Sequence, residues 1–236
     1  MSKYDITGHP LLPEDSTLNP WQKCVKDAII EVHGRWQPYS WTAGHGGVTQ
    51  DLYFRDKRLL SARSGPKGGA TYCCGITLEI FVTAWKNWYA QLTGKENLSY
   101  SQMKEILAYF FVYKTEDGKY DYGAQSGIGE YLYEELDWIN TETYEDPLEM
   151  PFGTFIQLQF QRDPHAGGHS AILVGTGKVK NKNAAFVYSS NNYYDTSWEH
   201  AAGQKPGPGF DYYFVNKVVD GFKREFHGAA IIPGDL

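Results

Sequence analysis

The 236-residue sequence predicts a single α+β domain, and two observations on residue spacing lead to this class. In the first half, apolar residues such as Ile76 and Ile80 recur at the spacing of a helix with a buried face. After Pro151, short apolar runs alternate with polar turns, as they do in an antiparallel sheet. No internal repeat or low-complexity linker divides the chain, so we expect one domain over 1–236 with helices packed on that sheet.

The first half is expected to contain an N-terminal arm and then three helices. Residues 1–19 are rich in proline and polar residues, which predicts an extended arm packed on the domain or a loose tail. Apolar residues on one side of 21–33 predict a helix that Gly34 ends. A second helix is expected over 73–92, and a third begins at Ser99 or Ser101. A short strand is expected near 52–54.

The segment from about 95 to 150 is expected to be a helical, acidic insertion before the sheet. It contains the third helix and, over 130–139, the pattern of a short amphipathic helix. Eleven acidic residues lie between Glu116 and Glu149. A run of like charges is usually a solvated face, and the alternative is a surface for a cationic partner.

The second half is expected to form five strands. Each candidate strand is rich in β-branched and aromatic residues and is bounded by glycine or polar turns. The first three follow one another closely enough to form an antiparallel meander. The expected strands cover 153–160, 168–175, 184–190, 212–218 and 228–232.

Composition excludes several classes of function. A net charge of −6 argues against binding to nucleic acid or to an anionic membrane. Three cysteines without zinc spacing form neither a disulfide framework nor a zinc site. No apolar run reaches the length of a membrane span. The first residues lack a secretory signal, so we expect a protein that is cytoplasmic as synthesised, or exported without a cleaved signal peptide.

Two adjacent cysteines, Cys73 and Cys74, lie at the start of the second predicted helix. Thr71 is a suitable N-cap residue, which would place Cys73 in the first helical turn. Unpaired backbone N–H groups there stabilise an anion, so a cysteine in this position can have a lowered pKa. The alternative is that both residues are small buried hydrophobes, which is the expected role of Cys24.

A thiol nucleophile needs a base, and the base needs a group that orients it. His169 begins a predicted strand, and polar residues end the next one at Ser190, Asn191 and Asn192. A helix that begins with cysteine, followed by a strand that begins with histidine and a later polar residue, is the order of papain-like enzymes. The sequence therefore indicates a papain-like catalytic site.

Four stretches resemble motifs of the NlpC-type cell-wall peptidases, a papain-like cysteine peptidase family related to the CHAP amidases. Residues 37–41 with the glycines at 44–47 resemble Gly-x-Pro-Tyr-x-Trp-Gly-Gly, and 72–76 resemble Asp-Cys-Ser-Gly-Leu. Residues 151–156 resemble Pro-Gly-Asp-Leu-Val with an offset of one residue, and 169–175 resemble His-Val-Gly-Ile-Tyr-Val-Gly. The motifs occur in the family's order.

The resemblance covers roughly residues 21–192 and selects between the two cysteines. The family has glycine two positions after the nucleophile and a large apolar residue three positions after it. Cys73 matches this pattern with Gly75 and Ile76, so Cys74 takes the position of the family's serine. Two positions depart from the family motifs. Tyr72 stands where the family has Asp before the nucleophile, and Thr154 stands where it has Asp after Gly153. These departures indicate a distant relative, whose substrate can differ from that of typical members.

The resemblance implies a fold and a role for each candidate site residue. The fold would be papain-like, with the nucleophile's helix packed on an antiparallel sheet. Cys73 would be the nucleophile and His169 the base. Asn191 would orient the base through its amide oxygen, with Ser190 and Asn192 left open. Substrate-binding or oxyanion roles fall to Tyr39, Trp41 and Cys74.

The implied activity is that of a cysteine amidohydrolase or endopeptidase that cleaves an amide bond in peptidoglycan stem peptides through a thioester. It would need no metal or organic cofactor. The partner would be a peptide or peptidoglycan fragment, and also an inhibitory immunity protein if the chain is an injected effector. One alternative is an acyltransferase, deamidase or transglutaminase-like enzyme on the same fold. A non-catalytic binding module is another.

Overall fold

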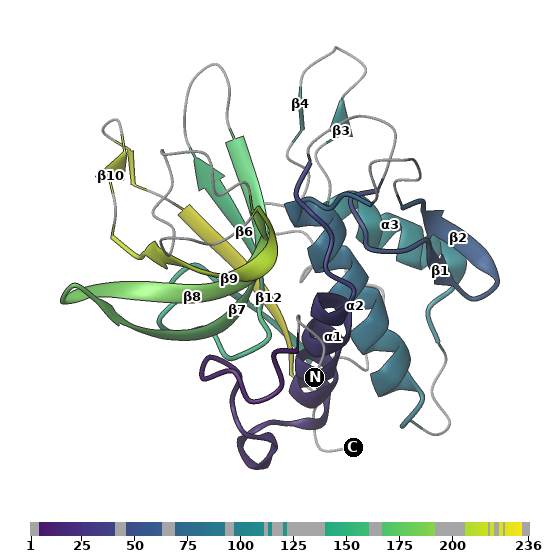
Figure 1. The fold of residues 1–236 in the computed structure, drawn as a ribbon, viewed down its shortest axis with the longest axis horizontal. Helices are drawn as coiled ribbons and strands as arrows, with labels where there is room; N and C mark the ends of the chain where they lie inside the picture. The colour runs from purple at the N-terminus through teal and green to yellow at the C-terminus, as the bar shows by residue number, and fades with distance from the viewer. Residues whose placement is uncertain are drawn as a thin grey trace.

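The computed structural model describes residues 5–40, 46–62, 69–92, 97–110, 113–114, 120–121, 140–160, 167–191, 206–216, 218–219, 222–223 and 225–232. Helices α1 and α2 lie together on one side of a six-stranded antiparallel sheet (Figure 1). The structure thus confirms the α+β class.

The first helix, α1, spans Pro20–Gly34, as predicted for 21–33. Asn19 and Gln22 form a capping box, in which each side chain bonds the backbone N–H of the other. Pro20 suits the first helical position because its missing N–H would have no partner there. The buried side of the helix carries Trp21, Cys24, Val25, Ala28, Ile29 and Val32.

The second helix, α2, spans Cys73–Tyr89 and is buried along most of its length. Its N-cap is Tyr72, so the prediction that Thr71 caps the helix is wrong. Thr71 instead pairs with Tyr39 in a parallel β-bridge, and its hydroxyl lies 2.8 Å from Ser190 Oγ. Among the helices in the described part of the chain, none has both the length and the apolarity needed to cross a membrane.

The expected insertion over 95–150 contains α3, Tyr100–Phe110, and also strands. The paired strands β3 (Tyr113–Lys114) and β4 (Tyr120–Asp121) follow α3, and β5 (Asn140–Tyr144) joins the main sheet. The insertion is therefore only partly helical. The sequence did not predict β5, because its residues are mostly polar. Antiparallel pairing with β12 gives this segment its strand conformation. The predicted helix over 130–139 lies outside the described residues.

The main sheet has the strand order β5-β12-β6-β7-β8-β9. The predicted meander is confirmed, because β6, β7, β8 and β9 are consecutive antiparallel neighbours. Lys180 and Asn181, which join β7 to β8, have positive φ angles of 48° and 62°, as in a type I′ turn. The strands are β6 (Phe155–Phe160), β7 (Gly167–Val179), β8 (Lys182–Asn191), β9 (Gly207–Phe214) and β12 (Glu225–Ile232).

Two short hairpins complete the described strands. The predicted strand near 52–54 is confirmed as β1 (Leu52–Phe54), which pairs with β2 (Lys57–Leu60). Near the C-terminus β10 (Val218–Val219) pairs with β11 (Phe222–Lys223). Figure 1 shows β1 and β2 beside α3, on the side of the helices away from the sheet.

The two faces of the sheet pack against different apolar side chains. Phe155, Ile172 and Tyr188 face α1 and α2 and join their core. The alternate positions form a second cluster on the opposite face, which includes Ala171 and Leu173. Because side chains alternate along a strand, His169 lies on the face of Ala171, and Ser170 lies on the face that meets α2.

Candidate functional site

Cys73 is the first residue of α2, so its sulfur lies at the end of the helix that stabilises an anion. Close packing of two backbones fixes this position. A Cβ atom at Gly75 would lie 2.3 Å from the carbonyl oxygen of Gly46, which excludes any larger residue without a shift of the backbone. Tyr72 N–H donates to the carbonyl of Gly47 at 3.3 Å, on the same loop. The loop at 46–47 therefore locates the first turn of α2.

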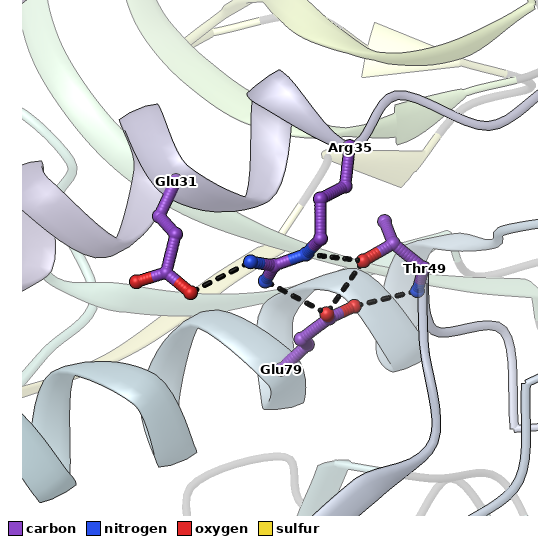
Figure 2. Close-up of polar contacts among 4 residues, drawn as sticks. All are labelled: Glu31, Arg35, Thr49 and Glu79. Atoms are coloured by element: carbon purple, nitrogen blue, oxygen red, sulfur yellow. Dashed lines mark hydrogen bonds and ion pairs between the residues drawn. The ribbon is translucent and has the colours of Figure 1, made fainter.

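A buried carboxylate holds this loop onto α2. Glu79 accepts from the Thr49 N–H at 2.7 Å and from the Thr49 hydroxyl at 2.6 Å. Figure 2 shows the Arg35 guanidinium between Glu79 and Glu31, bonded to both. Burial raises the pKa of Glu79, and the bonds from Thr49 and Arg35 oppose that rise. The network joins α1, the loop and α2 behind the candidate nucleophile.

The structure brings His169 to Cys73. Cys73 and His169 are only 7% and 6% exposed, and the proximity of His169 lowers the pKa of Cys73. The imidazole ring also lies 6.0 Å from the ring of Tyr213 on β9. The base expected from the sequence thus contacts the expected nucleophile.

The surroundings of Cys73 hold its pKa well below the usual value for a thiol. The largest cause is a hydrogen bond from the Cys74 thiol, and the positive charge and hydrogen bond of His169 add to it. The backbone N–H of Ser170 contributes as well, while burial acts in the opposite direction. The pKa of Cys74 is raised well above its usual value, first because its proton bonds Cys73 and then by burial.

Cys74 lies between α2 and the sheet. Its sulfur is 3.7 Å from Cys73 Sγ and 3.5 Å from the Ser170 hydroxyl oxygen. That hydroxyl donates to Gln157 Oε1 on β6 at 2.7 Å, across the pair Gln157↔Ser170. Cys74 thus contacts Cys73 and the floor of the site, and it is 3% exposed.

Asn191 is held by a buried carboxylate that the sequence analysis missed. Its side-chain N–H group donates to Asp211 Oδ2 at 3.1 Å, while Asp211 Oδ1 accepts from the Tyr212 N–H at 2.8 Å. The amide nitrogen of Asn191 therefore points at Asp211, which leaves its oxygen to accept from another group. In the sequence, the one sign that Asp211 is buried is its place between two aromatic residues, Phe210 and Tyr212.

Strand alternation places Asn191 and His169 on the same face of the sheet. β7 pairs with β8 from Ile172↔Tyr188 onward, and His169 and Asn191 each lie three residues beyond that pair, so both point away from the face of Ile172 and Tyr188. Ser190 lies on the other side, where its hydroxyl meets Thr71. The geometry therefore favours Asn191 over Ser190 as the orienting residue, and Asn192 lies outside the described residues.

Tyr39 packs against the cluster of Tyr72, Cys73 and Cys74. Its backbone N–H donates to the carbonyl of Pro206 at 3.2 Å, so the loop after α1 is fixed beside the start of β9. Burial raises the pKa of Tyr72, and the two neighbouring cysteines add to this rise. Trp41, the remaining expected substrate residue, lies outside the described residues.

Comparison of the chain with family models, with curated proteins and with solved structures finds no match. Across the described ranges, no group of three or more His, Cys, Asp or Glu side chains is arranged to hold a metal ion. The described part of the site supplies a thiol, an imidazole and a hydrogen-bonded amide.

Proposed function

We propose that the chain is a cysteine amidohydrolase or endopeptidase with a papain-like site, acting on peptidoglycan stem peptides. The observation that carries the chemistry is the position of Cys73. It begins a helix, contacts His169 and has its pKa held low. The substrate class rests on the resemblance of four sequence motifs to the NlpC-type peptidases.

In the proposed first step, the Cys73 thiolate attacks the carbonyl carbon of the scissile amide. The resulting oxyanion would be bound by the backbone N–H of Cys73, one of the donors that a helix start leaves unpaired, and by Tyr39 beside it. His169 then gives its proton to the leaving amine, and a thioester remains on Cys73. His169 next removes a proton from water, which attacks the thioester and releases the acid.

Asn191 and Asp211 would keep the imidazole in position during both steps. Asp211 fixes the amide nitrogen of Asn191, so the amide oxygen is available to the imidazole N–H. Such an acceptor selects one tautomer of the base and stabilises the imidazolium form. This arrangement supports a catalytic site over a simple binding module, which would not need an oriented base.

A second reaction on the same thioester is acyl transfer to an amine, which would make the enzyme an acyltransferase. The low exposure of Cys73 and His169 favours it, because a bound acceptor amine could exclude the competing water. The two reactions share Cys73, His169 and Asn191 and differ only in what attacks the thioester.

The test is a mass-spectrometric digest of purified peptidoglycan and its soluble fragments. We expect new peptide fragments with the parent protein and with Cys24→Ala, a change to a buried thiol in the α1 core. Cys73→Ala should produce none. Fragments joined to an added amine would support acyl transfer. Intact substrates with the parent protein, or cleavage by Cys73→Ala, would contradict the proposal.

A further inference from the structure

The adjacent thiol, Cys74, has a hydrogen-bonding role that the motif resemblance does not assign. The resemblance gives it the position of a serine near the substrate. In the structure its sulfur instead lies between Cys73 Sγ at 3.7 Å and Ser170 Oγ at 3.5 Å, with almost no exposed surface. Because Cys74 is enclosed in this way, its thiol can interact with Cys73 and Ser170 but not with a substrate in solution.

Counting protons defines what Cys74 can donate to. Ser170 has one hydroxyl proton, and the bond to Gln157 Oε1 at 2.7 Å uses it. While that proton bonds Gln157, the Ser170 oxygen can only accept from Cys74. The alternative, in which the Ser170 hydroxyl donates to Cys74 Sγ at 3.5 Å, gives up the shorter bond to Gln157. The single S–H proton of Cys74 then has two acceptors, Ser170 Oγ and Cys73 Sγ. A thiolate is the stronger acceptor, because a charged partner strengthens a hydrogen bond.

We propose that Cys74 is a positioning residue that stabilises the Cys73 thiolate by donating its S–H proton, and that Ser170 receives this proton when Cys73 carries an acyl group. The inference rests on the proposed role of Cys73 as the nucleophile. It explains why Ser170 is fixed by Gln157 on the neighbouring strand, since that bond keeps an oxygen lone pair directed at Cys74.

The directions of the two pKa shifts agree with this geometry. The pKa of Cys73 is lowered and that of Cys74 is raised, so the shared proton stays on Cys74. Other titratable groups that meet Cys73 within the described residues are His169 on β7, Tyr72 at the N-cap and Tyr39 on the loop. Of these, His169 is the one group whose protonated form is a cation, so its effect must be measured separately.

The experiment is the pH dependence of Cys73 alkylation by iodoacetamide, measured by mass spectrometry on the peptide that contains Cys73. In Cys74→Ala we expect the pKa of Cys73 to rise by about one unit, a roughly tenfold slower alkylation at low pH, because one charge-assisted hydrogen bond is lost. Cys74→Ser keeps a donor and should restore the parent profile. Ser170→Ala should not raise the pKa, because Cys74 then has Cys73 as its remaining acceptor.

An unchanged profile in Cys74→Ala, or a failure of Cys74→Ser to restore the parent profile, would overturn the proposal. If Cys74→Ala does not fold, Cys74→Val fills the site without a donor and must show the same rise. Alkylation needs no substrate. A parent protein in which Cys73 has a low pKa but which cleaves no amide would therefore refute the hydrolase alone. If the parent enzyme is active and Cys74→Ala leaves the pKa of Cys73 unchanged, only the role of Cys74 is refuted.

Discussion

Replacement of Glu79 by alanine tests how the structure holds the start of α2. Glu79 is fully buried and accepts two hydrogen bonds from Thr49 and one from Arg35. Its removal leaves the Thr49 N–H and hydroxyl without their acceptor in a buried site. The loop that meets Gly75 and Tyr72 then loses its attachment to α2.

The size of the effect follows from the exposure of the partners. Each buried bond from Thr49 to the carboxylate contributes about 1.5–3 kcal/mol. Arg35 is 26% exposed and can turn to water, so its ion pair adds little. Relief of the buried charge offsets part of the loss, which leaves a net destabilisation of about 2–4 kcal/mol. For a chain of this size that corresponds to a melting temperature lower by about 5–15 °C.

Glu31→Ala is the matched control, because Glu31 pairs with the same Arg35 at 2.6 Å but is 51% exposed. We expect it to lower the free energy of unfolding by less than about 1 kcal/mol. The assay is urea unfolding followed by tryptophan fluorescence, for the parent and both variants. If Glu79→Ala is as stable as Glu31→Ala, the buried bonds of Glu79 do not hold the loop onto α2.

Three further predictions concern other parts of the site and core. Gly75→Ala places a Cβ against the Gly46 carbonyl and should lower stability by about 1–3 kcal/mol, and an unchanged melting temperature would contradict this. Asp211→Asn should slow amide cleavage about tenfold with Cys73 still alkylated, and full activity would refute a role for Asp211. Burial lowers the pKa of His33 from 6.5 to about 4, so the unfolded chain binds its proton first and stability should fall as pH drops through that range. When the pH is lowered from 7 to 5, His33→Asn should lose less free energy of unfolding in urea than the parent protein does. Equal losses in the two proteins would be evidence against the titration of His33.

Periodicity was sufficient to predict most of the fold. The helix over 21–33 has one apolar face, and that face decides its secondary structure. The strands after Pro151 are short apolar runs between turns, and both faces of the sheet are buried. β5 was missed because its residues are polar, and pairing with a distant strand determines its conformation. The N-cap was misplaced for a similar reason, since Thr71 bonds Ser190 from the far end of the chain.

The site was predictable where chemistry depends on residue type. Cys73 and His169 were expected from their places at the starts of a helix and a strand, and the structure brings them into contact. Asp211 and Glu79 were not expected, because a carboxylate in a sequence looks the same whether it is solvated or buried. Only the tertiary structure shows that each one accepts hydrogen bonds inside the protein.

Activation of Cys73 by His169 is the central feature of the proposed catalytic site. The decisive measurement is the rate at which iodoacetamide modifies Cys73 at pH 6, in the parent protein and in His169→Gln. We predict rapid modification in the parent and a large loss in the variant, because the imidazolium no longer stabilises the thiolate. Equal rates in two folded proteins would contradict the pairing of Cys73 with His169, and with it the proposed cysteine hydrolase.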